Sequence, residues 1–313
     1  MRNKRVFLIV LNWNAWQMIA NCLASIAKAE TKGIDLKVLV VDNGSVDDSV
    51  EKIKKLVSSK IKNLKIHFIE NKENLGFAEG NNIGIKYALK NGADFVCLLN
   101  NDTRVKADFL LQLIEVAEKE EAGIVGGKIY FEKGYEFHKE RYKKKDLGKV
   151  IWYAGGKIDW QNVYASHRGV DEVDENQYDK VQETEYVNGC LMLVKSEVFK
   201  KVGLLDPKYF LYFEENDFCQ RAKKAGFKLY YGPKAVIWHL NAGSSGPGSA
   251  LHDYFLTRNR LLFGMRWAPL KSKIALIKES VKILISGREW QKTAIRDFYL
   301  RNLGKGSWGK KNG

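Results

Sequence analysis

The 313-residue sequence predicts an α/β fold with a mostly parallel central sheet flanked by helices. Two observations point to this fold class. Apolar runs of strand length alternate with helical stretches through the first 130 residues, and these runs are apolar throughout, as in strands covered on both faces. Because strands that alternate with helices form parallel βαβ units, we expect an open sheet with helices on both of its faces.

The first half of the chain supplies the elements in regular order. The predicted strands lie at residues 5–11, 36–42, 64–70, 94–99 and 122–130. The predicted helices between them lie at residues 15–28, 46–58, 78–90 and 106–120. Further along, EYVNGCLMLVKSEVFKKVG (185–203) indicates another strand and a short helix. The charged stretch HKERYKKKD (138–146) is typical of a solvated loop, which we expect over residues 131–185.

Four of the predicted strands end in clusters of polar residues. These clusters are NWN (12–14), DNGS (42–45), ENKEN (70–74) and NND (100–102). Each cluster alone is typical of a turn or a helix cap, since Asn, Asp, Gly and Ser are the residues that turns use. The carboxyl ends of parallel strands share one edge of the sheet, however, and ligands bind beyond that edge. We therefore expect the four clusters to line one rim and to form a site.

The sequence FVCLLNNDTRV places Asn100, Asn101 and Asp102 directly after a buried strand. Carboxylate and amide oxygens are the hard ligands that hold Mg²⁺ or Mn²⁺ on phosphates. Asp102 is the best single ligand, whereas Asn100 offers only a neutral carbonyl oxygen or a hydrogen bond to a ribose or phosphate. The cluster therefore predicts a divalent cation that binds a diphosphate.

The formal net charge of +15 predicts attraction to polyanions such as nucleic acid, an anionic membrane or a phosphate-bearing ligand. Most of this charge lies near the carboxyl end, where thirteen Lys or Arg and three acids follow from Arg260 on, a net charge of +10. The apolar residues of this region that share one helical stripe are Ile274, Ile277, Val281, Leu284 and Ile285, with Lys273, Lys278 and Lys282 beside them. Such a helix packs on the main domain or lies in a membrane interface, and the sequence leaves both interpretations open.

No window approaches the ~18 uninterrupted apolar residues of a membrane-spanning helix, and VFLIVL near the amino terminus is too short for a signal sequence. We therefore expect a cytoplasmic chain. The four cysteines are far apart and form no C-x-x-C pair, which argues against a zinc site or a disulfide framework. We expect buried, reduced thiols at Cys22, Cys97, Cys190 and Cys219.

Six motifs occur in the order in which family-2 glycosyltransferases carry them. They are VLNWN, VVDNGSVDDS, NLGFAEGNNIGI, LLNND, YVNGCLMLVKSEVFKKVGLLDPKYFLYFEENDFCQR and WHLNAGSS. The sequence resembles this family over about residues 5 to 265, and FLYFEENDFCQR is similar to its Y-F-E-D-x-D-L-x-x-R motif. The middle segment and DYFLTRNRLLF (253–263) are similar to those of rhamnosyltransferase-like members. The resemblance implies the nucleotide-diphospho-sugar transferase fold, the A-type fold of glycosyltransferases.

The resemblance implies a nucleotide-sugar donor. Asp42 matches the residue that contacts the base, and Trp13 matches the position that stacks near it. Asn100 and Asp102 match the outer positions of the D-x-D metal site, so Asn100 removes one charge from that site. His239 in IWHL matches a histidine that completes the metal or diphosphate site in relatives, although a lone histidine after a strand is more often structural.

The donor contacts that we predict are Asn12, Trp13, Asp42, Asn74, Gly76, Phe77, Asn81, Asn100, Asn101 and Arg258, and the predicted metal ligands are Asp102 and His239. Asn74, Gly76, Phe77 and Asn81 match the ribose and phosphate region of the family. Asn12, Asn100 and Asn101 stand in the polar clusters at the strand ends. Arg258 lies on a predicted helix from which it could meet the diphosphate, and a surface salt bridge is the alternative for it.

The reaction that the resemblance implies is inverting transfer, in which an acceptor hydroxyl attacks the anomeric carbon in line with the leaving nucleoside diphosphate. A carboxylate must take the hydroxyl proton, and a divalent cation, Mn²⁺ or Mg²⁺, must stabilise the diphosphate. Glu215 aligns with the catalytic base, while Glu214 and Asp217 orient the loop, the acceptor or an arginine. Without the resemblance, three acids at a helix start would indicate a cap. Repulsion among them raises a pKa toward the working pH, as a base requires.

We accordingly predict a catalytic domain over residues 1–265, with a nucleotide-binding half (1–130) and an acceptor half (131–265), before a basic amphipathic helical extension (266–313). The expected donor is a UDP- or dTDP-linked sugar, dTDP-rhamnose among them. The expected acceptor is a saccharide or a lipid-linked saccharide in cell-surface polysaccharide synthesis. We expect the extension to bind the inner face of the cytoplasmic membrane.

A non-enzymatic basic protein that binds nucleic acid or membranes is the alternative function. The basic region is a helical tail without a nucleic-acid reader motif, so we expect no nucleic-acid partner. A nucleotide-dependent dehydrogenase is disfavoured because its G-x-G-x-x-G turn would stand where the sequence reads NWNAWQ.

Overall fold

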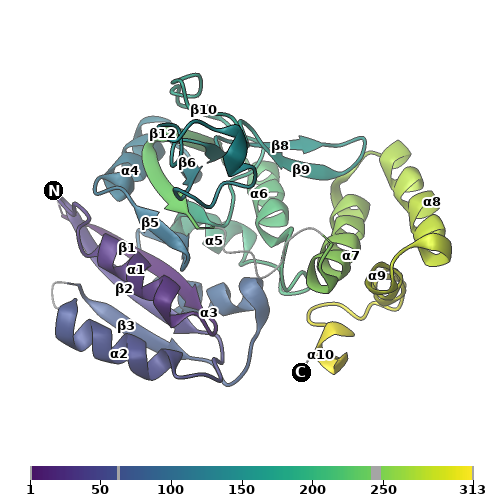
Figure 1. The fold of residues 1–313 in the computed structure, drawn as a ribbon, viewed down its shortest axis with the longest axis horizontal. Helices are drawn as coiled ribbons and strands as arrows, with labels where there is room; N and C mark the ends of the chain where they lie inside the picture. The colour runs from purple at the N-terminus through teal and green to yellow at the C-terminus, as the bar shows by residue number, and fades with distance from the viewer. Residues whose placement is uncertain (1, 62–63, 241–247, 312–313) are drawn as a thin grey trace.

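The computed structural model of the protein describes residues 2–61, 64–240 and 248–311. Residues 241–247, which carry the second half of the WHLNAGSS motif, lie outside the described residues, and so do the last two residues of the basic extension. In the described part, helices cover both faces of one large mixed sheet, and a group of helices lies beside it (Figure 1). The predicted α/β fold class with a mostly parallel sheet is confirmed.

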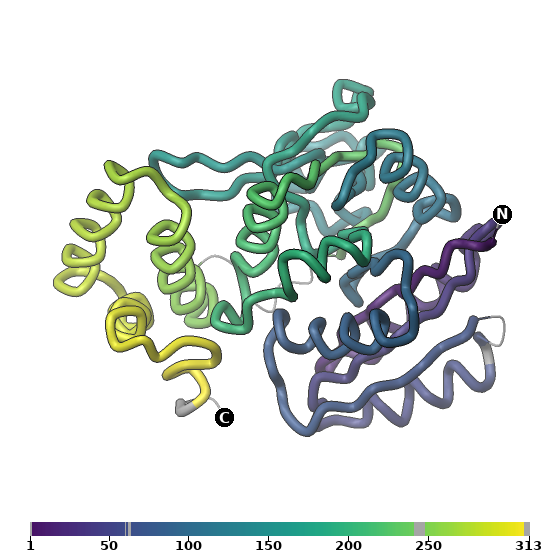
Figure 2. The backbone as a smooth tube through the Cα atoms, turned by 180° about the vertical axis from the view of Figure 1, so that it is seen from behind, coloured from purple at the N-terminus to yellow at the C-terminus, as the bar shows by residue number. Residues whose placement is uncertain are grey.

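The first half of the chain contains the predicted alternation. In chain order it forms β1 (Lys4–Asn12), α1 (Trp16–Ile26), β2 (Ile34–Asp42), α2 (Ser49–Lys60), β3 (Ile66–Glu70), α3 (Gly76–Lys90), β4 (Phe95–Asn100), β5 (Thr103–Val105), α4 (Phe109–Lys119) and β6 (Ile124–Phe131). β1 is parallel to both of its neighbours, β2 and β4. α1 and α2 cover the face turned to the viewer in Figure 1, and α3 lies on the opposite face, as Figure 2 shows from behind. Val, Ile and Leu dominate β1 and β2 because helices bury both faces.

The second half completes the same sheet. Its elements up to the last strand are a 3₁₀ turn (Lys139–Arg141), β7 (Ile151–Tyr153), β8 (Gly156–Asp159), β9 (Tyr164–His167), β10 (Gln182–Glu183), β11 (Leu191–Lys195), α5 (Ser196–Val202), α6 (Glu214–Lys224) and β12 (Leu229–His239). β11 lies between β4 and β6 and is antiparallel to both, whereas β12 is parallel to β6. The order along the sheet is β10-β12-β6-β11-β4-β1-β2-β3. One sheet therefore runs through both predicted halves, and their division by function stays a prediction.

The middle segment is more ordered than the solvated loop that we predicted. The charged stretch 138–146 is largely exposed, but the residues after it form β7, the β8–β9 hairpin and β10. Lys128 on β6 is almost completely buried, and its Nζ lies 2.7 Å from the Asp174 carboxylate and 2.6 Å from that of Asp179. A buried lysine needs such partners because an unpaired charge is costly to bury. These ion pairs hold the acidic segment on the sheet.

Within the described residues, the helices α7 (Ala250–Trp267), α8 (Leu270–Ser286), α9 (Glu289–Tyr299) and α10 (Trp308–Lys311) follow β12. They lie together on one side of the molecule, away from β1, β2 and β3 (Figures 1 and 2). None of the helices in the described ranges has the length and apolar character needed to span a bilayer. All four cysteines are buried and free, as predicted.

The amphipathic stripe lies on α8, and most of it faces solvent. The exposed apolar residues of this helix are Leu270, Ile274, Ile277, Val281 and Ile285. The buried residues of the helix are Ser272, Leu276 and Ser280. Leu276 packs so closely on α7 that a Cβ on Gly264 would lie 2.2 Å from its Cδ1. The helix therefore packs on its neighbours through its other side, and that packing leaves the predicted stripe exposed.

Candidate functional site

The predicted rim lies along the carboxyl ends of β1, β2, β3 and β4. Asn12 at the end of β1 pairs with Asp42 at the end of β2, and Asp42 pairs with Glu70 at the end of β3. On the other side of β1, Leu11 pairs with Asn100 of β4. Because these strands are parallel and in register, the four polar clusters follow one another along a single edge, where α/β proteins bind ligands. The prediction of one rim is confirmed.

Side-chain hydrogen bonds join three of the strand ends at this rim. The Asn12 Nδ2 donates to the Asp42 carboxylate at 3.1 Å, and the Asn101 Nδ2 donates to the Asn12 Oδ1 at 3.3 Å. The Asp42 carboxylate also accepts from the backbone N–H of Ser45 at 2.9 Å and from its hydroxyl at 2.6 Å. These bonds fix the buried Asp42, while the half-exposed Trp13 indole lies next to Asn12 in the chain. Both residues stand where we predict the nucleotide base.

Asn43, which sequence reasoning misses, organises the next part of the rim. Its Nδ2 donates to the Asn74 Oδ1 at 3.1 Å and to the Gly76 carbonyl at 3.0 Å, and its Oδ1 accepts from the Leu75 N–H at 3.2 Å. Gly76 has a φ of +78°, and a Cβ there would lie 2.5 Å from Phe210, so this turn requires glycine. Asn43 could have been found only from its place beside Asp42 in DNGS.

Residues 188–190 form a turn between the predicted nucleotide-binding half and Glu215, the predicted catalytic base. A Cβ on Gly189 would lie 3.1 Å from the Phe77 ring and 3.9 Å from the Cβ of Glu215. The next residue, Cys190, accepts a hydrogen bond through its carbonyl from the Asn100 N–H at 3.0 Å. Glu215 and the strand end that carries Asn100 therefore contact the same short turn.

Asp102 and His239 meet across the antiparallel pair β5–β12. The Asp102 Oδ2 lies 3.1 Å from the His239 Nε2, and the Asp102 carbonyl accepts from the Leu240 N–H at 2.9 Å. Burial raises the pKa of Asp102, but the charge of His239 and the hydrogen bond from its ring outweigh burial, so the pKa lies below its ordinary value. The His239 Nδ1 is buried and has no hydrogen-bond partner among the described residues.

The Asp102–His239 pair offers a carboxylate oxygen and an imidazole nitrogen, two kinds of atom that bind divalent cations in proteins. The Asp102 Oδ2 and the His239 Nε2 are 3.1 Å apart, the distance of a direct ion pair. Within the described ranges, no group of three or more His, Cys, Asp or Glu side chains could hold a metal by itself. An ion at this pair would take its remaining ligands from phosphate oxygens and water, as Mg²⁺ does on nucleotides.

Two aromatic residues of the middle segment connect this pair to the turn 188–190. The Trp152 ring lies 4.7 Å from the His239 ring and 4.2 Å from the His167 ring, measured between centroids. The His167 Nδ1 lies 3.0 Å from the Trp152 carbonyl oxygen, and its Nε2 lies 3.3 Å from the Asn188 Nδ2. Burial lowers the pKa of His167 to about 4, so the ring is neutral near pH 7. Sequence reasoning misses these residues because no polar cluster marks them.

Glu214 and Glu215 begin α6 in buried surroundings. One carboxylate oxygen of each is buried and has no hydrogen-bond partner among the described residues. Burial raises the pKa of both carboxyls, to about 7 for Glu215, and the charge of Glu215 raises that of Glu214 further. Glu214 is 4% exposed, whereas Glu215 is partly exposed. Of the two residues, Glu215 is the more exposed.

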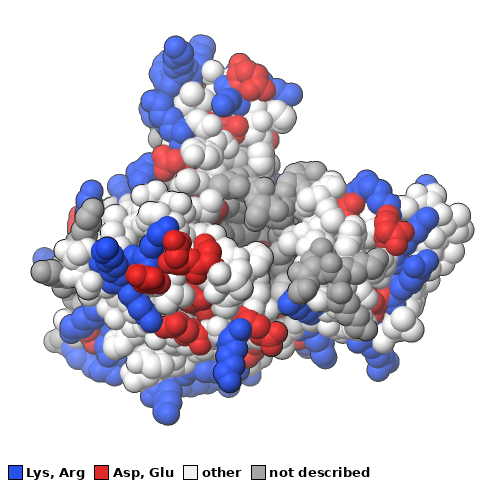
Figure 3. Space-filling model, turned by 60° about the horizontal axis from the view of Figure 1, so that its bottom comes forward, with Lys and Arg blue, Asp and Glu red and all other residues white. Residues whose placement is uncertain are grey.

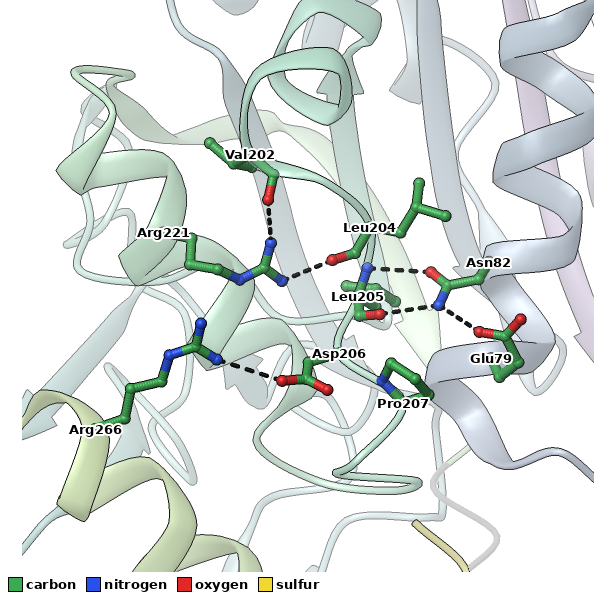
Figure 4. A pocket seen from close by; sticks show the side chains of 9 residues that line it. All are labelled: Glu79, Asn82, Val202, Leu204, Leu205, Asp206, Pro207, Arg221 and Arg266. Atoms are coloured by element: carbon green, nitrogen blue, oxygen red, sulfur yellow. Dashed lines mark hydrogen bonds and ion pairs between the residues drawn. The ribbon is translucent and has the colours of Figure 1, made fainter. Parts of the chain in front are cut away.

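Asp217, the third predicted acid, is fully buried and paired. Its carboxylate accepts from the Arg221 Nε and the Trp267 Nε1, both at 2.8 Å, and lies 3.0 Å from Arg266. Arg221 and Arg266 also line a hollow of about 400 Å³ beside Asp206 (Figure 4). None of the predicted site residues lines this hollow. Asp217 therefore pairs with two arginines, and its orienting role in the reaction stays a prediction.

Arg258 and Asn81 direct their polar atoms into the fold. The Arg258 guanidinium is fully buried and donates to the Tyr254 hydroxyl at 3.2 Å and to the Tyr209 carbonyl at 3.1 Å. The alternative of a surface salt bridge for Arg258 is therefore wrong, because its guanidinium is buried. The Asn81 Nδ2 donates to the Phe77 carbonyl one turn earlier in α3, at 2.9 Å. Donor contacts from Arg258 and Asn81 stay predictions.

Comparisons with known proteins agree with the predicted resemblance. The family model described as Glycosyl transferase family 2 matches residues 7–203. The chain is 23% identical over 296 residues to the dTDP-rhamnosyl transferase RfbF of Shigella flexneri, which covers 92% of this chain and 85% of that relative. It is 37% identical over 67 residues to the N-acetylglucosaminyl-diphospho-decaprenol L-rhamnosyltransferase of Mycobacterium tuberculosis, over 21% of this chain and 22% of the relative. The rhamnosyltransferase-like resemblance is confirmed at the level of distant homologues.

Two solved structures share the fold. The mannosyltransferase PcManGT from Pyrobaculum calidifontis, in complex with GDP-Man and Mn²⁺, has a TM-score of 0.57 at 15% identity, over 96% of this chain and 75% of that one. GalNAc-T7 with UDP, GalNAc and Mn²⁺ has a TM-score of 0.68 at 14% identity, over 99% of this chain and 56% of that one. At these identities the likeness shows the fold alone, and it confirms the predicted A-type fold.

Proposed function

This chain belongs to glycosyl transferase family 2 and is a glycosyltransferase, and from that premise we propose that it is an inverting enzyme with a nucleoside-diphosphate sugar as donor. One observation carries the proposal. The turn 188–190 lies next to Glu215 on one side and next to the end of β4 on the other, which supports a proton acceptor and a diphosphate site on one rim. Inverting transfer needs these two groups at opposite sides of the anomeric carbon.

In the proposed reaction, Glu215 accepts the proton of the acceptor hydroxyl. The hydroxyl oxygen then forms a bond to the anomeric carbon, while the bond from that carbon to the diphosphate oxygen breaks and the nucleoside diphosphate leaves. Asp42 and Trp13 hold the base, and the asparagines of the rim bind ribose and phosphate. A divalent cation held by Asp102 and His239 would stabilise the charge that develops on the leaving diphosphate.

The narrower proposal concerns the substrates. The relative that aligns over most of the chain is named a dTDP-rhamnosyl transferase, which supports dTDP-rhamnose as the donor. The hydroxyl of a saccharide or of a lipid-linked saccharide is the proposed acceptor. The second relative, whose name specifies a lipid-linked N-acetylglucosaminyl diphosphate acceptor, supports the lipid-linked form.

A donor panel tests this proposal. We expect release of nucleoside diphosphate from dTDP-rhamnose in the presence of Mn²⁺ or Mg²⁺, faster than from UDP-glucose or GDP-mannose, and loss of that release in EDTA. Rapid release from GDP-mannose but not from dTDP-rhamnose would overturn the choice of donor. No release from any donor, together with a salt-sensitive gel shift of random DNA, would instead support the alternative of a non-enzymatic nucleic-acid binder.

The exposed stripe on α8 supports a membrane partner for the enzyme. Leu270 and Ile285 at the two ends of the helix are 74% and 76% exposed, and the flanking Lys271, Lys278 and Lys282 are exposed as well. Figure 3 shows Lys and Arg side chains, together with Asp or Glu side chains and uncharged surface, on the side where the carboxyl-terminal helices lie. An apolar stripe bordered by lysines matches the interface of an anionic bilayer. We propose that α8 binds the inner face of the cytoplasmic membrane, where a lipid-linked acceptor is presented.

Flotation with vesicles measures this contact. The double variant Lys278→Glu and Lys282→Glu should weaken binding to phosphatidylglycerol vesicles by at least about fivefold per lysine. The double variant Ile277→Ser and Val281→Ser should weaken it as well, through lost apolar burial. The matched control is Lys143→Glu with Lys144→Glu in the exposed charged stretch, which should change binding little. Unchanged flotation of the α8 variants, or a dimer that Ile277→Ser disrupts, would show that the stripe does not face lipid.

A further inference from the structure

The segment 208–213, which precedes the two glutamates of α6, has an unusual backbone. Phe210, Tyr212 and Phe213 have φ values of +64°, +68° and +73°, in the left-handed region that residues other than glycine rarely adopt. The Leu211 N–H donates to the Tyr209 carbonyl at 2.7 Å across Phe210, as in the rare γ-turn with positive φ. Phe213 is the residue from which α6 begins. A backbone of this kind persists only where its surroundings hold it.

Two neighbouring side chains of α7 hold this segment by its carbonyl groups. The Asn259 Nδ2 lies 2.8, 2.7 and 2.9 Å from the carbonyl oxygens of Tyr209, Leu211 and Tyr212. The Arg258 guanidinium donates to two carbonyls of the same segment at 3.1 and 3.3 Å. Its Nε also donates to the Asn259 Oδ1 at 3.0 Å, which keeps the amide NH₂ turned toward the carbonyls. Both side chains are completely buried.

The carbonyl of Phe210 faces the donor half. It accepts from the N–H groups of Phe77 and Ala78, at 2.7 and 3.3 Å, at the start of α3. Further along α3, the Asn82 amide donates to the Leu205 carbonyl at 2.9 Å and accepts from its N–H at 3.1 Å (Figure 4). The segment is therefore held between α3, which carries predicted donor contacts, and α7.

We propose that Asn259, oriented by Arg258, is a positioning residue for the transfer reaction. It keeps the segment in its left-handed conformation. With that conformation, α6 starts at a position from which Glu215 can face the rim. The same conformation holds the Phe210 carbonyl against the start of α3. Without the Asn259 donors, the carbonyls of Leu211 and Tyr212 would lose this side-chain partner, and the Tyr209 carbonyl would keep only Arg258 and the Leu211 N–H. The backbone would then move to an ordinary conformation. The inference rests on the proposed function, since Glu215 is the base in that proposal.

The substitution Asn259→Asp tests the proposal, because it keeps the shape of the side chain and removes both donors. We expect kcat to fall on the order of 100-fold, as a misplaced catalytic group does, with the donor KM changed by less than about threefold. Amide hydrogen exchange over residues 208–218 should rise. The matched control is Arg260→Gln on the same helix, where the guanidinium bonds the Asn162 carbonyl at 3.0 Å and Glu279 at 2.8 Å and does not bond the segment.

The control variant should lose thermal stability while its kcat and its exchange over 208–218 stay near those of the wild type. A second variant adds Tyr212→Gly to Asn259→Asp. Glycine adopts positive φ without strain, so the double variant should recover part of the lost kcat. The proposal is wrong if Asn259→Asp loses no more kcat than Arg260→Gln, or if its segment exchanges as in the wild type. A wild type without transfer activity would refute the proposed function instead, and the exchange measurement would still test how the segment is held.

Discussion

Replacing Glu215 with glutamine should abolish transfer while the enzyme still binds its donor. The amide cannot accept the acceptor proton, and general base catalysis contributes about 10²- to 10⁴-fold, so kcat should fall within that range. Donor affinity should change by less than about threefold, because the donor contacts lie on other elements. Steady-state transfer rates with calorimetric titration of the nucleoside diphosphate separate the two effects.

The pH profile of the wild type should report the same carboxyl. Burial raises the pKa of Glu215 to about 7, and a base works only when deprotonated, so the rate should fall as the pH drops below about 7. Since the folded pKa lies above the ordinary 4.5, this group stabilises the fold below about pH 4.5, and that contribution is lost as the pH rises through about 7. At pH 8, Glu215→Gln should therefore melt at a higher temperature than the wild type. At pH 5, the difference between the two melting temperatures should be smaller.

Glu197→Gln is the matched control, since Glu197 is an exposed acid in the first turn of α5. It should keep the wild-type rate, pH profile and melting temperature. An active Glu215→Gln enzyme would show that another group takes the proton, and Glu214→Gln would be the next variant to compare. An inactive Glu215→Gln that also fails to bind the nucleotide would assign Glu215 to the donor site.

The rim was predictable because local sequence decides where each buried strand ends. The apolar runs end at Asn12, Asp42 and Asn100, and the buried Asn12 and Asp42 are held there by hydrogen bonds to their polar atoms. Strand direction was not predictable in the same way. β11 is as apolar as its neighbours β4 and β6 yet runs antiparallel to both, and its direction depends on where the chain enters the sheet again after the middle segment.

Arg258 shows why the rest of the site could not be predicted from local sequence. We predict a diphosphate contact for this cation from its place on a helix, and the structure shows that its guanidinium also bonds backbone carbonyls of a distant segment. The contact exists because α7 packs against the segment that precedes α6, and no local pattern encodes that packing. Asp102 and His239 lie together because β5 and β12 pair through main-chain groups and bring the two side chains to the same edge. Their role as metal ligands stays a prediction.

Asp102→Asn should make donor binding insensitive to the cation. The amide keeps the shape of the carboxylate but removes its charge, which leaves His239 as the one strong ligand of the pair. We expect the affinity for dTDP or UDP in Mn²⁺ to fall on the order of 10- to 100-fold. In EDTA the variant and the wild type should bind alike, because the lost interaction is the one through the ion. Titration calorimetry in both conditions measures the difference.

Asn100→Asp should move the affinity in the opposite direction. Asn100 stands where the family carries the first acid of its metal motif, and an added carboxylate at the end of β4 would give the ion a second charged ligand beside Asp102. Asp35→Asn is the control, because Asp35 lies near the start of β2 at the opposite edge of the sheet, where it pairs with Arg5 at 3.5 Å. If Asp102→Asn weakens nucleotide binding equally with and without Mn²⁺, Asp102 contacts the nucleotide directly. In that case the 3.1 Å contact with His239 is an ordinary ion pair, and the diphosphate must be neutralised by other groups.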